Sequence, residues 1–380
     1  MSPESIERIS SPDLAGTTMP DMVIVAPDAF AEQAERLANL HRDMDGLRVM
    51  TVTPQAVYDE FSGGKQDPLA FRELLRSYYK RTAGQHPRYL LLMGKGTYDP
   101  RNLTGDHGIT LVTGEAYNSF GDNGNTYCSD DMAGYIEDGE SGRPSESLDV
   151  GIGRLPVKSV DEARHLVDKI EGYMNRRDLT EDDPRGDWRN NVVLLADDAD
   201  PGSVYDTMFA HDAEKLATRI KALHPQYNII RVFADAFVQQ SGSSGSFYPD
   251  VNNTLQQKIN YGCLLLNYIG HGSTQYIGTE RYITQDDIES YSNLERLAFF
   301  VTSTCSFGRH DLIDEVCGAE RFLLAPGGGI GLVTATRPIV HHEAFNTLLC
   351  TNLLNPDYSV GDAWRTAKRS EERRVGKECR

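Results

Sequence analysis

Apolar runs of strand length alternate with helical patterns along most of the chain. The runs Met22–Val25 and Tyr89–Met93 are short and continuously apolar, which is typical of strands buried in a sheet. Between such runs apolar residues recur at helical spacing, and the segment 68–81 begins with a proline, which a helix tolerates in its first turn. Strands that alternate with helices indicate parallel sheets flanked by helices, so the pattern predicts an α/β fold.

The expected elements form two series, separated by a polar stretch at 175–188. The first series has strands at 22–25, 48–53, 89–93 and 149–155, and helices at 29–43, 68–81 and 160–176. The second has strands at 191–196, 228–234, 263–269, 297–304 and 329–336, and helices at 206–223, 252–261, 285–293, 319–325 and 342–354.

This division predicts an N-terminal α/β subdomain at 21–176 and a C-terminal α/β subdomain at 188–368, after a poorly defined segment at 1–20. Two subdomains fit the length of 380 residues, since a domain usually has about 100–200. The stretch 94–148 interrupts the rhythm, because it is rich in Gly, Asp, Asn and Ser. Such a long insertion in a compact domain is usually functional or disordered.

Composition narrows the classes of function. The net charge of −18 argues against a nucleic-acid partner, because binding phosphates requires clustered Lys and Arg. No stretch approaches the ~18 consecutive apolar residues of a transmembrane helix. The amino terminus has no basic segment followed by an apolar core, so it does not resemble a signal peptide.

The carboxy-terminal tail is excluded from the prediction of the fold, and the cysteines give little information about it. Residues 369–380 look like the in-frame translation of a sequencing adapter, so we expect the natural chain to differ after Lys368. The cysteines before this tail are widely spaced and include no Cys-x-x-Cys pair, which indicates neither a disulfide framework nor a zinc site. They are Cys128, Cys263, Cys305, Cys317 and Cys350.

Candidate chemistry gathers at the ends of two neighbouring strands. The strand at 263–269 is followed by His271 between two glycines, and the strand at 297–304 is followed by Cys305. A helix with Thr284 as its N-cap lies between them in sequence, which makes the whole a βαβ unit. Because such a unit usually places its strands side by side and parallel, His271 and Cys305 should leave the sheet at one edge, where ligands bind.

A histidine beside a cysteine can produce a nucleophile. The imidazole takes the thiol proton, and the thiolate then attacks a carbonyl carbon. The backbone N–H groups of Gly272 and Cys305 are candidate donors to the oxyanion that forms. Taken singly, a cysteine after a strand is more often a small buried apolar residue, and a histidine beside glycine is often only a turn residue. Their joint placement favours catalysis.

The segments around these two residues resemble the gingipain family of cysteine peptidases. The similarity is carried by Asn-Tyr-Ile-Gly-His-Gly-Ser at 267–273 and by Thr-Ser-Thr-Cys-Ser-Phe-Gly-Arg at 302–309. Within that family the chain looks most like the sortase-like enzymes of the type IX secretion system. Further similar segments lie at 58–68, 91–100, 150–156 and 328–337.

The resemblance implies a caspase-like α/β fold in two subdomains, with His271 and Cys305 as the catalytic pair. It also implies an exported protein at the bacterial outer membrane or cell surface, acting beside other secretion components. Its substrates would be secreted cargo proteins, whose carboxy-terminal sorting domain it removes before their linkage to a surface lipopolysaccharide. Two alternatives stay open: a free-standing secreted gingipain-like protease, and a catalytically silent surface scaffold that binds proteins.

The resemblance further implies an acidic residue that orients the histidine. The matching stretch is 195–201, where Asp198 is our choice and Asp197 and Asp200 are close rivals. The same acids could instead cap the next helix or bind a cation. No organic cofactor is implied.

Calcium is the metal that the family resemblance suggests. Gingipains can bind calcium, and the acid-rich segment 128–131 would suit a hard cation. No spacing specifies a site, so no metal ligand is assigned. After the strand at 329–336 come Arg337, His341 and His342, which either line the cleft or are simply exposed.

Overall fold

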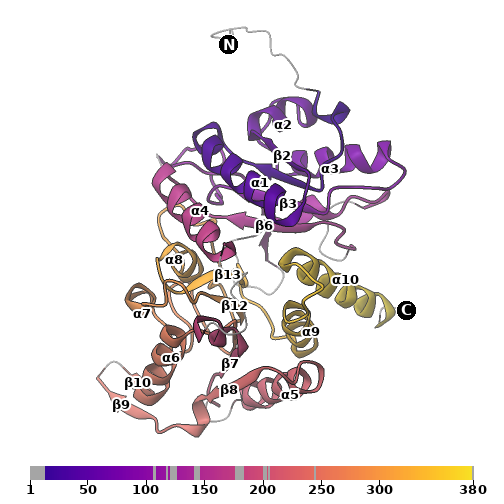
Figure 1. Ribbon diagram of the computed structural model, residues 1–380. Helices are drawn as coiled ribbons and strands as arrows, with labels where there is room; N and C mark the ends of the chain where they lie inside the picture. The colour runs from indigo at the N-terminus through magenta and orange to yellow at the C-terminus, as the bar shows by residue number, and fades with distance from the viewer. Residues whose placement is uncertain are drawn as a thin grey trace.

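The computed structural model describes residues 13–105, 108–116, 119, 126–140, 146–175, 184–199, 203, 206–243 and 245–378. Its two main sheets are entirely parallel and are flanked by helices, so the predicted α/β fold is confirmed. In Figure 1 the sheet of the N-terminal half lies above the sheet of the C-terminal half. The predicted subdomain boundaries stay a prediction, and residues 176–183 of the polar stretch lie outside the described residues.

The first sheet has the strand order β2-β1-β3-β6. Its strands are β1 (Met22–Val25), β2 (Val49–Val52), β3 (Tyr89–Met93) and β6 (Gly151–Leu155). Its helices are α1 (Ala31–Asp45), α2 (Pro54–Phe61), α3 (Leu69–Arg81) and α4 (Val160–Met174). Short 3-10 helices occur at η1 (Leu14–Gly16), η2 (Asp28–Phe30) and η3 (Asp131–Gly134).

The second sheet has the order β13-β12-β11-β7-β8. Its strands are β7 (Asn191–Ala196), β8 (Asn228–Phe233), β11 (Leu265–Ile269), β12 (Ala298–Ser303) and β13 (Gly329–Val333). Its helices are α5 (Thr207–Leu223), α6 (Pro249–Tyr261), α7 (Gln285–Ser290), α8 (Gly318–Leu324), α9 (Glu343–Leu353) and α10 (Val360–Glu378), with 3-10 helices η4 (Pro184–Asn190) and η5 (Ala234–Ala236). Every residue of β7 and β11 is buried, as expected for strands with helices on both faces.

Two small antiparallel pairs complete the fold. Strand β4 (Gly114–Glu115) pairs with β5 (Cys128–Ser129) inside the long insertion. Strand β9 (Gln240–Gly242) pairs with β10 (Gly245–Phe247) as a hairpin, at the lower left in Figure 1. The sequence pattern predicted none of these strands, because they are too short to show a periodicity of their own.

Local sequence signals account for several element ends. Thr284 caps α7 as predicted, and its hydroxyl and the Asp287 carboxylate satisfy each other's backbone N–H groups in a capping box. Helix α1 ends at Gly46, whose φ of 67° lies in the left-handed region that glycine adopts freely. Helix α2 was not predicted, although Thr53 at its N-cap and Pro54 in its first turn are typical start signals.

Two lysines, the buried Lys95 and the partly buried Lys169, join the two halves of the molecule. The Lys95 ammonium, just after β3, lies 3.0 Å from the Glu320 carboxylate of α8, and both side chains are only 2% exposed. From α4, Lys169 donates to the carbonyls of Leu323 (2.9 Å) and Ala325 (2.6 Å) at the end of α8. Burial lowers the pKa of Lys169 to about 7. These bonds fix α8, and the sheet that it covers, against the N-terminal half.

Among the described residues, no helix is both long and apolar enough to cross a membrane. The five cysteines that the structure describes are all free thiols.

Candidate active site

The site is built at the carboxyl ends of β11 and β12. These strands are neighbours, parallel and in register, with Ile269 opposite Ser303. The loops that follow them therefore leave the same edge of the sheet and touch. A Cβ atom added to Gly272 would overlap the Thr304 hydroxyl, so the close approach requires glycine there. His271 and Cys305 are thus placed on adjacent loops, as the βαβ pattern predicts.

The imidazole of His271 is half exposed and contacts a buried acid. Its Nε2 lies 3.1 Å from Oδ1 of Asp206, whose side chain is 5% exposed. A carboxylate only accepts hydrogen bonds, so the neutral ring carries its hydrogen on Nε2 and keeps a free lone pair on Nδ1. The ring also packs edge-on against Phe209, at 5.4 Å between centroids. Both partners belong to the start of α5.

The backbone of His271 is held by a second acid. Its N–H donates to Oδ2 of Asp197 at 2.7 Å, and the Tyr268 hydroxyl donates to the same oxygen at 3.0 Å. Burial raises the pKa of Asp197 to about 6. Asp197 therefore positions the loop and not the ring.

The structure places Asp206, and not Asp198, against the imidazole. The Asp198 carboxylate is buried and accepts hydrogen bonds from the hydroxyls of Tyr248 (2.9 Å) and Tyr282 (3.0 Å). Those bonds direct it away from His271, which corrects our choice of Asp198 as the residue in contact with the ring. Asp200 lies outside the described residues. One signal could have found Asp206, since it begins a predicted helix after a parallel strand of the same sheet.

Cys305 is partly buried, and its sulfur lies against the peptide of a neighbouring loop. The N–H of Ile339 donates to Sγ at 3.5 Å, and the Ile339 carbonyl lies 3.6 Å from Sγ. Ser306 follows with a φ of 57°, which turns the chain sharply after the cysteine. Among the described residues no hydrogen bond joins Cys305 to His271. Catalytic contacts are often loose without substrate and tighten when it binds.

Both predicted oxyanion donors are available. Within the part of the chain that the structure describes, the N–H groups of Gly272 and Cys305 donate to no acceptor. The Thr304 hydroxyl beside them is buried and also lacks a partner there. This arrangement leaves polar groups free to meet a substrate carbonyl.

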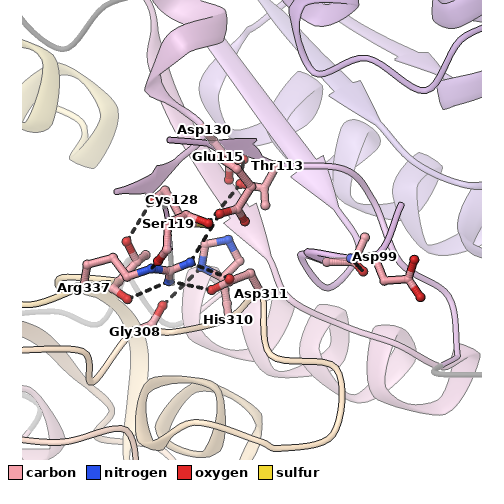
Figure 2. A network of polar contacts seen from close by, with 12 residues as sticks. Asp99, Thr113, Glu115, Ser119, Cys128, Asp130, Gly308, His310, Asp311 and Arg337 are labelled. Atoms are coloured by element: carbon pink, nitrogen blue, oxygen red, sulfur yellow. Dashed lines mark hydrogen bonds and ion pairs between the residues drawn. The ribbon is translucent and has the colours of Figure 1, made fainter. Parts of the chain in front are cut away.

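A buried ionic network joins Arg337 to acids from two distant segments of the chain (Figure 2). Arg337, 3% exposed, contacts both carboxylate oxygens of Asp311, at 2.9 and 2.7 Å, and Glu115 at 3.3 Å. Burial raises the pKa of Glu115 to about 7. Burial also acts to raise the pKa of Asp311, but its hydrogen bonds from Arg337 lower it overall. Arg337 is therefore buried, and it ties the loops that follow β12 and β13 to the insertion of the N-terminal half.

The two histidines after Arg337 also have hydrogen-bond partners. His341 contacts the Ser303 hydroxyl, and the side chain of His342 accepts a hydrogen bond from the Phe345 N–H at the start of α9.

Two clusters of side chains in the described residues have donor atoms close enough to hold a cation. Glu115, Cys128 and Asp311 form one, and Asp197, Asp198 and Glu280 form the other. The first already has Arg337 as its counter-charge. In the second, burial raises the pKa of Glu280 to about 7 and that of Asp197 to about 6, so protons can neutralise it. No metal is assigned to either.

The acids of the segment predicted to suit calcium have other partners. Asp130 forms an ion pair with Arg154 at 2.7 Å, and Asp131 lies 3.3 Å from the Lys368 ammonium. Calcium binding there stays a prediction.

Comparisons with known proteins identify the family and support the fold. The sequence profile of peptidase family C25 matches residues 16–378. The complex of Porphyromonas gingivalis RgpB pro- and mature domains is 16% identical, with a TM-score of 0.66, over 91% of this chain and 72% of that one. The Arg-specific cysteine proteinase gingipain R (RgpB) is also 16% identical, with a TM-score of 0.65, over 91% and 71% of the two chains. The expected gingipain-like fold is thus confirmed.

A third similar structure is that of dimeric latent PorU from Porphyromonas gingivalis. It is 30% identical, with a TM-score of 0.38, over 42% of this chain and 16% of that one. No curated protein matches the chain significantly.

Proposed function

The chain belongs to peptidase family C25, a family of cysteine peptidases, and we propose that Cys305 is its nucleophile and His271 its general base. The observation that carries the proposal is the register of β11 and β12, which brings the two residues to touching loops. Asp206 supports it, because its contact with Nε2 of His271 leaves Nδ1 free to accept a proton.

The first half of the reaction forms an acyl-enzyme. Nδ1 of His271 takes the thiol proton of Cys305, and the thiolate attacks the scissile carbonyl carbon. The negative charge that develops on the carbonyl oxygen is met by the N–H groups of Gly272 and Cys305, and each such donor contributes about 10²–10³ in rate. The tetrahedral intermediate then collapses, the C–N bond breaks, and His271 gives its proton to the leaving amine.

The second half resolves the thioester. His271 removes a proton from an incoming water or amine, which attacks the acyl carbon and releases the Cys305 thiol. Water gives hydrolysis, and an amine gives transfer of the acyl group as in a sortase. The buried Asp206 carboxylate stabilises the imidazolium in both halves, since opposite charges a few Å apart favour each other away from solvent.

The substrate class that we propose is secreted cargo bearing a carboxy-terminal sorting domain. The support is the motif resemblance around His271 and Cys305 to sortase-like enzymes of the type IX secretion system. The proposal includes an exported location at the outer membrane or cell surface, beside other components of that system. A free-standing secreted protease of the same family is the alternative, with the same chemistry and its own cleavage preference.

A thiol-directed probe tests the assignment of the nucleophile. A peptide halomethyl ketone should label Cys305 of the folded chain, and His271→Asn should slow the labelling by about 10²-fold or more. The buried thiols of Cys263 and Cys350 serve as internal controls that stay unlabelled until the chain unfolds. A folded chain in which Cys305 is not labelled would favour a silent scaffold.

Mass analysis of products distinguishes the two outcomes of the second half. Cargo carrying a sorting domain is incubated with the chain in the presence of an amine acceptor. A product heavier by the acceptor supports transfer, and a product carrying only water would reject transfer for that cargo and acceptor.

A further inference from the structure

A second acid–histidine pair lies beside Cys305, and the proposed reaction does not use it. Nδ1 of His341 is 2.7 Å from the Ser303 hydroxyl, and Nε2 of the same ring is 3.3 Å from Oδ2 of Asp212. The Asp212 side chain is 1% exposed and that of His341 is 13% exposed. Among the described residues, neither Nε2 of His341 nor Oδ2 of Asp212 forms a hydrogen bond, and the two buried atoms face each other as an ion-pair contact of 3.3 Å.

Ser303 and His341 both lie close in sequence to groups at the proposed nucleophile. Ser303 is the last residue of β12 and lies two residues before Cys305. His341 lies two residues after Ile339, whose peptide N–H and carbonyl contact the Cys305 sulfur. The hydrogen bond between Ser303 and His341 therefore links the end of β12 to the loop whose Ile339 peptide contacts the sulfur.

The hydrogen directions are fixed by chemistry. Asp212 can only accept, so Nε2 of His341 carries a hydrogen toward it, and Nδ1 accepts from the Ser303 hydroxyl. Burial lowers the pKa of His341, although Asp212 opposes the shift, and a neutral ring is what this pattern requires. The other charged or titratable groups around the pair are Lys215 and His211, at 3.0 and 3.7 Å from Oδ1 of Asp212, and Glu343 and His342 beside His341.

We propose that Asp212, His341 and Ser303 form a relay that positions the Ile339 peptide against the sulfur of Cys305. The three are positioning residues: none of them contacts the reacting sulfur. With the relay intact, the Ile339 N–H is seated to donate to the thiolate, which favours the ionised form of the nucleophile. Without it, the loop that carries Ile339 loses its tether to the end of β12, and that hydrogen bond is no longer enforced.

The proposal rests on Cys305 being the nucleophile, and its test reads the thiol directly. The rate at which iodoacetamide alkylates Cys305 is measured against pH in the 380-residue chain, by mass analysis of the Cys305 peptide. In Ser303→Ala and His341→Gln the alkylation rate near neutral pH should fall by roughly threefold to tenfold, the effect of losing one hydrogen bond to the thiolate. The midpoint of the pH profile should rise.

Two control variants separate positioning from general stability. Lys215→Gln removes an ion-pair partner of the Asp212 Oδ1 without touching His341, and its alkylation profile should match the wild type. Ser303→Thr keeps the hydroxyl, so its alkylation profile should match that of the wild type. Thermal unfolding is recorded for every variant. If His341→Gln does not fold, the comparison of Ser303→Ala with Ser303→Thr tests the relay at its Ser303 end.

The outcomes are distinguishable. A profile for Ser303→Ala that equals that of the wild type would overturn the relay while leaving Cys305 as the nucleophile. An equal loss in Lys215→Gln would overturn it as well, because the effect would then belong to α5 as a whole. A wild-type Cys305 that iodoacetamide does not alkylate in the folded chain would overturn the proposed function and the relay together.

Discussion

At the scale of single residues, His271 is held by two carboxylates that do different work. Asp206 contacts the ring at Nε2, and Asp197 accepts the hydrogen bond of the backbone N–H. The first contact determines which ring nitrogen can act as a base, and the second fixes where the loop leaves the sheet.

Replacing Asp206 should therefore impair catalysis without unfolding the chain. In Asp206→Asn the amide can still occupy the site, but it no longer stabilises an imidazolium. We expect kcat/KM on a cleaved peptide to fall by about 10²-fold, with little change in the unfolding midpoint. Asp198→Asn is the matched comparison, since Asp198 is also buried but contacts tyrosines. A larger kinetic loss in Asp198→Asn than in Asp206→Asn would restore the assignment made from the sequence.

The sequence was sufficient to predict that His271 and Cys305 lie on adjacent loops, and it was not sufficient to find Asp206. Both loops follow continuous apolar runs that end at the same sheet edge, so local pattern and one topological rule placed them. The acid is chosen by where α5 begins relative to the histidine loop, which depends on a connection from 197 to 206 that carries no periodic signal. The burial of Arg337 could not be predicted for a related reason, because its partners Asp311 and Glu115 come from distant segments.

At the scale of elements, the ends of β11 and β12 work as one unit. Gly272 packs on Thr304 so closely that no side chain fits between them. The candidate oxyanion donors, one on each loop, are thereby kept at a fixed separation. A change that forces the loops apart should lower the reaction rate even though it removes no functional group.

Gly272→Ala tests this coupling. The added methyl group overlaps the Thr304 hydroxyl, so the loops must separate, and we expect kcat to fall by roughly 10²–10³-fold, as for the loss of one oxyanion donor. Thr304→Ala alone should have a small effect. The double variant should recover part of the loss, because the overlapping oxygen is gone, and the recovered part is measured as a double-mutant cycle. Strict additivity of the two changes would contradict the contact.

The strand and helix pattern was predicted well where apolar runs are long. Strands β1, β3 and β7 have the predicted bounds, and α7 begins after its predicted cap. Helix α7 ends at Ser290, earlier than the predicted 285–293, because Tyr291 is extended and buried in the core. Tertiary packing of this kind overrides local helical pattern.

At the scale of the whole molecule, the two halves are joined by buried charges and not by apolar contact alone. Lys95 and Glu320 stand far apart in the sequence, yet both side chains are only 2% exposed. Nothing in the local sequence marks either residue as buried, so this pair was beyond prediction. Removing one member should leave the other charged group without a counter-charge inside the protein.

Lys95→Met should lower the free energy of unfolding by about 3 kcal/mol, which is typical when one partner of a buried ion pair is lost. Burial already raises the pKa of Glu320, although Lys95 opposes the shift, so protonation of the carboxyl limits the loss. Lys65→Met, at an exposed position, is the control and should stay within about 0.5 kcal/mol of the wild type. Urea unfolding measures both, and equal midpoints for the two variants would show that the pair contributes nothing.

The network of Figure 2 predicts a pH dependence of stability. Burial raises the pKa of Glu115 from its ordinary 4.5 to about 7 in the folded chain. The folded state then binds a proton that the unfolded state has released. The resulting stabilisation is fully present below about pH 4.5 and is lost as the pH rises through about 7.

Glu115→Gln removes this proton exchange. The difference in unfolding free energy between about pH 5 and about pH 8 should be smaller in the variant than in the wild type. Glu137→Gln, at an exposed position, should keep the wild-type dependence. Parallel pH profiles for Glu115→Gln and the wild type, from urea midpoints, would contradict the raised pKa.

The site depends on the number of residues between the two acids of helix α5, Asp206 and Asp212. The first residues of the helix contact His271 through Asp206, and further along Asp212 faces His341. A helix is rigid at about 1.5 Å of rise and 100° of rotation per residue. One residue inserted within the helix between these acids would rotate one of them away from its histidine while the helix itself survived. Substitutions on the exposed face of α5 should therefore be tolerated in homologous enzymes, whereas insertions and deletions between its two acids should not.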